Sequence, residues 1–119
     1  MMKLSLIIPA YNEANNIGQC LQSIIDQDIG SQHQIEIIVV DNGSTDETSK
    51  IAASFPQVKV VTESRKGISQ ARQTGYLAST GNLIANIDAD NRLPHDWIKK
   101  VFYEFETDTE LVSLSGPYI

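Results

Sequence analysis

Residues 83–90 read LIANIDAD, an apolar run that ends abruptly in two carboxylates, Asp88 and Asp90. The run has the length of a buried strand, and Gly81 before it and Pro94 after it interrupt regular structure. In a parallel sheet, ligands bind beyond the carboxyl ends of the strands, where both carboxylates are expected to lie. Carboxylates with no Lys or Arg directly beside them suit a hard divalent cation, and that cation suits a ligand carrying phosphate.

An Asp-x-Asp sequence is a weak signal by itself. Two acids after a strand more often form a turn that caps the next helix, because Asp and Asn favour such positions. The segments around this stretch therefore decide between a turn and a ligand site.

The rest of the chain alternates between apolar runs of strand length and segments of helical periodicity. Strands are expected at 3–9, 35–40, 58–62 and 111–114, besides the run that begins at Leu83. Helices are expected at 16–27, 44–55 and 67–81 and from Pro94 onwards. Ser44 and Glu47 have the spacing of a capping box, which would start the second helix.

The third expected helix has small residues on its inner face. Its inner positions are Ile68, Ala71, Gly75 and Ala78, and Gly81 is the expected C-cap. Small side chains on that face allow the helix to approach the sheet closely.

Strands that alternate with helices predict right-handed βαβ units, and hence an α/β fold with a mainly parallel sheet and helices on both faces. Every strand-to-helix turn then lies at the same edge of the sheet. These turns are residues 10–13, 41–46, 65–67 and 88–90. The sequence therefore predicts a polar edge that carries charges of both signs.

Composition narrows the possible partners and compartments. The 119 residues, with 41% hydrophobic and 20% charged side chains, are typical of one globular domain, 1–119. A net charge of −6 argues against a nucleic-acid groove. Cys20 has no second thiol for a disulfide or a zinc site, and its apolar helical stripe predicts burial. With no signal peptide or membrane span in the sequence, we expect a cytoplasmic protein.

Several polar residues at this edge have a structural and a ligand-binding interpretation. Tyr11 could stack on a base or simply pack half-exposed, and Glu13 could orient a ligand or complement a helix dipole. For Asp46 the structural interpretation is preferred, namely that of an acid in the first turn of a helix. Asp41 ends a strand, where a carboxylate can accept an imide N–H from a base or a hydroxyl from a ribose.

Three basic residues, Arg65, Lys66 and Arg72, lie within eight positions of the chain at the same edge. Cations that face two acids and a metal would suit a diphosphate. The positive charge of Arg72 opposes the dipole of its helix, which indicates a ligand. For Lys66 taken alone, a solvated position at the start of the helix is the preferred interpretation. His33 and His95 do not have metal-ligand spacing.

Four motifs together resemble the inverting family 2 glycosyltransferases of the GT-A fold. They are residues 5–13 (SLIIPAYNE), 39–46 (VVDNGSTD), 67–75 (GISQARQTG) and 88–90 (DAD). The resemblance implies a Rossmann-like three-layer sandwich. It also implies a nucleotide-diphospho-sugar donor of the UDP or GDP type and Mg²⁺ or Mn²⁺ as cofactor.

The resemblance also assigns roles to individual residues. Those expected to bind the donor are Pro9, Ala10, Tyr11, Glu13, Asp41, Arg72, Asp88 and Ala89. Within this set, Asp41 would contact the base, Arg72 the base or phosphates, and Asp88 the ribose or a metal-bound water. Asp90 would ligate the metal that bridges the phosphates, and the metal would act as a Lewis acid on the leaving group.

The chain departs from the family pattern in three places. Asn42 and Arg65 stand where the family often has Asp and Asn. The family's general base lies in a C-terminal half that follows residue 119, so no catalytic residue is assigned here. We expect a donor-binding domain that ends before the acceptor half and has little or no activity alone. In the full-length protein, later segments could attach it to the cytoplasmic face of the membrane; the acceptor is unknown.

Other functions fit the sequence less well. A metal-dependent phosphatase also uses Asp-x-Asp, but on an early strand, and Arg92 stands where it has Thr or Val. A phosphorylation-switch domain would need a Lys on a late strand, and a dehydrogenase would need G-x-G-x-x-G after the first strand. A non-catalytic nucleotide-binding module stays as an alternative.

Overall fold

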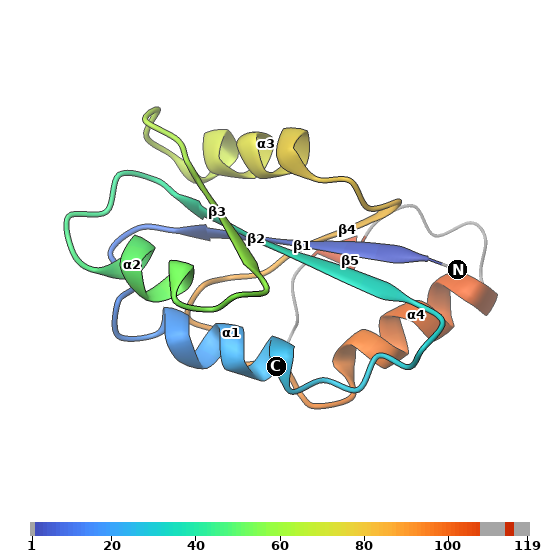
Figure 1. Cartoon of the computed structure of the whole chain (residues 1–119). Helices are drawn as coiled ribbons and strands as arrows, with labels where there is room; N and C mark the ends of the chain where they lie inside the picture. Colours follow the sequence, from blue (N-terminus) through green and yellow to red (C-terminus); the bar gives the residue numbers. More distant parts are fainter. Residues whose placement is uncertain (1, 108–113, 116–119) are drawn as a thin grey trace.

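The computed structural model describes residues 2–107 and 114–115 and shows a parallel sheet with the strand order β3-β2-β1-β4-β5 (Figure 1). The strands are β1 (Lys3–Ala10), β2 (Gln34–Asp41), β3 (Val58–Thr62), β4 (Leu83–Asn86) and β5 (Leu114–Ser115). The helices are α1 (Ile17–Ile25), α2 (Thr48–Ala53), α3 (Ile68–Ala78) and α4 (Trp97–Thr107). This is the expected α/β architecture, and the bounds of β3 are those predicted. Of the strand expected at 111–114, residues 111–113 lie outside the described residues.

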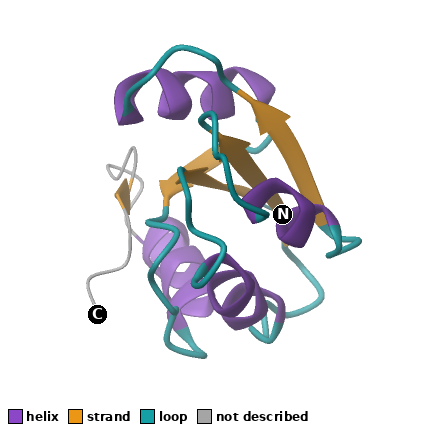
Figure 2. Ribbon diagram, turned by 90° about the vertical axis from the view of Figure 1, so that its left-hand side faces the viewer, coloured by secondary structure: helices purple, strands orange, loops and turns teal. Residues whose placement is uncertain are grey.

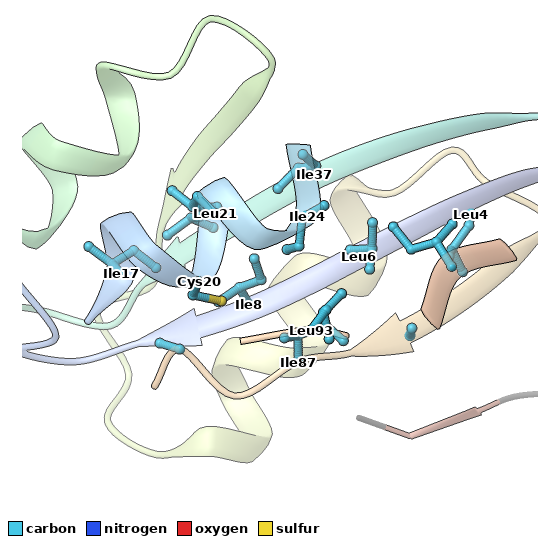
Figure 3. Close-up of a cluster of buried hydrophobic side chains, with 14 of the residues drawn as sticks. Leu4, Leu6, Ile8, Ile17, Cys20, Leu21, Ile24, Ile37, Ile87 and Leu93 are labelled. Atoms are coloured by element: carbon cyan, nitrogen blue, oxygen red, sulfur yellow. The ribbon is translucent and has the colours of Figure 1, made fainter. Parts of the chain in front are cut away.

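Helix α3 covers one face of the sheet, and α1, α2 and α4 cover the other (Figures 1 and 2). Alternate residues of β1 face opposite layers: Leu6 and Ile8 pack with α1 and α4, whereas Ile7 packs with Ala71 of α3. The larger layer also encloses Cys20, which is fully buried as predicted (Figure 3). Both faces are therefore apolar, as parallel sheets require.

Two glycines let the neighbouring backbone approach β1 closely. A Cβ on Gly75 would lie 2.3 Å from Cγ2 of Ile7, which confirms the close approach expected of α3. A Cβ on Gly81 would lie 2.7 Å from the carbonyl oxygen of Lys3 and 2.6 Å from Oγ of Ser5. The C-cap of α3 is Ser79 rather than Gly81, so the role expected for Gly81 was wrong.

Two further local predictions were wrong. Helix α2 begins at Thr48, and Ser44 does not cap it, because its hydroxyl accepts the backbone N–H of Asn12 instead. Asp46 has a structural role, because it accepts the N–H of Thr48 at 3.0 Å, but it lies before the helix rather than in its first turn. Ile68 was expected on the inner face of α3 but is 51% exposed, because it begins the helix at the sheet edge.

Strand register brings the strand-to-helix turns together at one edge of the sheet. Ala10 pairs with Asp41, Asp41 with Thr62, and Ile7 with Asn86 two residues before Asp88. The carboxyl ends of β1, β2, β3 and β4 therefore meet, as the sequence predicted. No helix in the described part of the chain combines the length and hydropathy needed to cross a membrane.

Candidate functional site

A pocket of about 470 Å³ opens at this edge between the β1–α1 and β3–α3 loops. Its lining residues come from the ends of β1 and β2 and the start of α3: Pro9, Ala10, Tyr11, Glu13, Asn42, Lys66, Gly67 and Ile68. All four residues of the first motif that the sequence assigned to the donor line it. We call this hollow the Tyr11 pocket.

The β1–α1 loop is fastened to the β2–α2 loop by side-chain hydrogen bonds. Asn12, whose φ is 53°, donates its backbone N–H to Oγ of Ser44 at 2.9 Å and accepts the N–H of Thr45 through Oδ1 at 2.8 Å. Asn tolerates this left-handed conformation better than most residues. The N–H of Glu13 donates to Oγ1 of Thr48 at 2.9 Å. These bonds hold the loop in place and leave the adjacent Tyr11 ring 52% exposed.

Asn42 joins the β2–α2 loop to the β3–α3 loop. Its Nδ2 donates to the carbonyl oxygens of Glu63 at 2.9 Å and Arg65 at 2.7 Å, and its Oδ1 accepts the N–H of Gly67 at 3.1 Å. An aspartate could not donate the first two bonds. The departure from the family pattern at this position is therefore structural, which sequence reasoning missed because the partners lie more than 20 residues away.

Glu63 organises the β3–α3 loop from a buried position. Arg65 donates to Oε1 through Nη2 at 2.7 Å, and the Thr74 hydroxyl donates to the same oxygen at 2.6 Å. These hydrogen bonds, that from Arg65 first, lower the pKa of Glu63 to about 2. The guanidinium of Arg65 is therefore engaged within its own loop, and nothing in the sequence indicated this pairing.

Asp41 lies at the expected edge but not in the Tyr11 pocket. Its side chain is 8% exposed, and Oδ1 accepts the N–H of Ser44 at 3.0 Å. It lines a neighbouring hollow of about 320 Å³ with Gly43, Thr62 and Glu63. The contact with a base expected of Asp41 stays a prediction.

The Asp-x-Asp motif follows β4 directly, with both carboxylates exposed and Ala89 buried between them. Cys20 lies beneath the motif, its Sγ 3.7 Å from the carbonyl oxygen of Asp88. Burial, followed by the charges of Asp90, Glu13 and Asp88, raises the pKa of the Cys20 thiol from 9.0 to about 12. Carboxylates from both the β1–α1 and the β4–α4 loops thus act on Cys20.

The two motif carboxylates fit a divalent metal that the ligand helps to hold. Within residues 2–107, neither Asp88 nor Asp90 forms an ion pair, and no three His, Cys, Asp or Glu side chains form a metal-binding group. A hard cation such as Mg²⁺ is commonly bound by one or two carboxylates, with phosphate oxygens and water completing its shell. Asp90 and Asp88 provide that type of ligand set.

Arg72 lines a different hollow from the Tyr11 pocket. That hollow lies between α3 and β4 and includes Tyr76, Ile84 and Asn86. The Oδ1 atom of Asn86 is buried and has no hydrogen-bond partner among the described residues. Asn86 is the last residue of β4, two positions before Asp88, so Arg72 lines a hollow at the end of the strand that leads to the motif.

The family description "Glycosyl transferase family 2" matches residues 5–119, and the chain therefore belongs to this family. The glycosyltransferase GlyA of Streptococcus pneumoniae is 32% identical over an alignment of 113 positions that covers 89% of this chain and 16% of that protein. Family membership favours the glycosyltransferase hypothesis over the phosphatase and switch-domain alternatives.

Two solved structures share the fold. S. aureus TarS 1-349 in complex with UDP-GlcNAc superposes with a TM-score of 0.81 at 26% identity, and the match covers 89% of this chain and 32% of the TarS 1-349 chain. The mannosyltransferase PcManGT of Pyrobaculum calidifontis, in complex with GDP-Man and Mn²⁺, superposes with a TM-score of 0.73 at 32% identity, and the match covers 85% of this chain and 32% of that one. The chain thus has the Rossmann-like GT-A fold and spans about a third of these two crystallised chains.

Proposed function

We propose that this chain is the donor-binding part of an inverting glycosyltransferase and that it holds a nucleotide-diphospho-sugar through a divalent metal. The observation that carries the proposal is the convergence of the Tyr11 pocket and the Asp-x-Asp motif at one edge of the sheet. The UDP-sugar bound by TarS and the GDP-sugar and Mn²⁺ bound by PcManGT support it. A UDP- or GDP-linked sugar is the proposed donor class, and the acceptor is open.

The residues divide into two groups by chemistry. Tyr11 is 52% exposed and lines the pocket together with Pro9 and Ala10, so its ring can take part in stacking with a base. Asp90 would hold the metal, which when bound neutralises the diphosphate as it leaves, and Asp88 would face the ribose or a metal-bound water. Asp41, in the adjoining hollow, would accept an N–H from the base or a hydroxyl from the ribose.

Isothermal titration with UDP and with GDP, each with Mn²⁺ or with EDTA, tests the proposal. We expect binding that needs the metal and that is lost in Asp90→Asn, because an amide is a poorer ligand for a hard cation than a carboxylate. Asp26→Asn is the matched control, since Asp26 is an exposed acid at the end of α1. Equal affinity in EDTA, or equal loss in the control, contradicts the role of Asp90.

A further inference from the structure

The ammonium of Lys66 lies over the aromatic face of Tyr11, with Nζ 4.4 Å from the ring centroid. This contact joins the β3–α3 loop to the β1–α1 loop across the Tyr11 pocket, which both residues line. It covers one face of the ring, so a flat ligand that stacks on this face must displace the ammonium. A cation in this position is attracted by the quadrupole of the ring.

The backbone on both sides of Lys66 is fixed while its side chain is exposed. Asn42 bonds the carbonyl oxygen of Arg65 and the N–H of Gly67, the two chain neighbours of Lys66. A Cβ at Gly43 would lie 3.1 Å from Nζ of Lys66, so glycine leaves the space that the ammonium occupies. The ammonium can therefore leave the ring by rotation of the side chain alone.

Lys66 is also the cation that remains for a ligand in this pocket. It is the only basic residue among the lining residues and forms no ion pair with the described residues. Arg65 is engaged by Glu63, and Arg72 opens into another hollow. With Glu13, Asp88 and Asp90 near the same edge, an anionic ligand without its metal would meet mainly negative charge.

From these contacts we infer that Lys66 determines selectivity for nucleotides over nucleosides. A base that stacks on Tyr11 displaces the ammonium, which then pairs with the phosphate groups of the same ligand. A neutral nucleoside displaces the ammonium without providing a new partner for it. The inference rests on the proposed function, because it requires that the pocket takes the base of a nucleotide.

Titration of Lys66→Met tests the inference with four probes: uridine, UDP, guanosine and GDP, all in the presence of Mn²⁺. Met keeps the length of the side chain and removes the charge. We expect about tenfold weaker binding of the diphosphate that the wild type prefers, the loss of one charge-assisted bond. The matching nucleoside should bind about threefold more tightly, because stacking no longer breaks a cation–π contact. Lys59→Met, another exposed lysine, should change neither.

The outcomes separate this inference from the proposed function. If the wild type binds neither diphosphate, the proposed function fails, and the inference fails with it. If the wild type binds but Lys66→Met weakens nucleoside and nucleotide equally, or changes neither, the proposed function stands and the inference is wrong. Proton NMR gives a second readout: ring current should shift the ε-methylene of Lys66 in the free protein, and the diphosphate should remove that shift. A shift that persists at saturation also overturns the inference.

Discussion

The two halves of the ligand edge are built in different ways. Around the Tyr11 pocket, side chains bond from loop to loop: Asn12 joins the first loop to the second, and Asn42 joins the second to the third. At the β4–α4 loop, the carboxylates of Asp88 and Asp90 accept no hydrogen bond from the described residues. The first half is held together by bonds between its own loops, whereas the carboxylates of the second are free for the metal that we propose.

This difference fits what each half is proposed to bind. A base is flat and nearly neutral, so a rigid pocket binds it at a low entropic cost. A metal needs carboxylates whose lone pairs are free, and hydrogen bonds to them would compete with coordination. Three acids that gather without a cation repel one another, which is tolerated at the exposed end of a strand but not in the core.

The largest expected effect is on stability and comes from the half of the edge around the Tyr11 pocket. Asn42→Ala removes three hydrogen bonds between loops, and we expect a loss of about 2 kcal/mol in the free energy of unfolding, measured by urea titration. Asn91→Ala is the matched control, since Asn91 lies in the β4–α4 loop and only its backbone bonds to Asp88. The free energy of unfolding of Asn91→Ala should stay within about 0.5 kcal/mol of that of the wild type. Equal losses in the two variants would remove the distinction between the halves.

The next effect is a pH dependence of stability. Hydrogen bonds from Arg65 and Thr74 lower the pKa of Glu63 from 4.5 to about 2. A lowered pKa in the folded state stabilises the protein above pH 4.5, and this contribution is lost as pH falls towards 2. Glu63→Gln should therefore be less stable than the wild type at neutral pH, with the difference shrinking across this window. Urea midpoints measured over the window test this.

Glu47→Gln serves as the control for this pH series. Its carboxylate is exposed and lies 4.0 Å from Lys50, an arrangement that contributes little. A difference between wild type and Glu63→Gln that stays constant from neutral pH to pH 2 would show that Glu63 acts by packing rather than by its charge.

The smallest effect concerns the half of the edge formed by the β4–α4 loop. Asp90→Asn removes one of the charges that raise the pKa of Cys20 to about 12, so this pKa should fall but stay above 9.0, because burial is the larger cause. The raised pKa stabilises the folded protein below pH 9.0, and that contribution disappears as pH rises towards 12. The rate of Cys20 alkylation against alkaline pH, read by mass spectrometry, measures the shift. A pKa unchanged from wild type would place Asp90 too far from Cys20 to share its site.

Regular elements were predictable from the sequence because their signals are local. Apolar runs of strand length and helical spacing located each described strand and helix to within a few residues, and β3 without error. The capping box at Ser44 failed because Asn12, more than 30 residues away, competes for the same hydroxyl. Ile68 was misplaced because helical periodicity does not say where along its length a helix leaves the sheet.

The sequence by itself determined the alternation of strands and helices, the shared edge of their turns and the acids that follow β4, since hydrophobic periodicity and chain order suffice for these. Only the tertiary structure decided that Lys66 contacts Tyr11, that Asn42 bonds to the β3–α3 loop, and that Arg72 shares a hollow with Asn86 rather than with Tyr11. The physical reason is that side-chain contacts between loops depend on strand register and on distances of a few ångströms, which no spacing along the chain specifies.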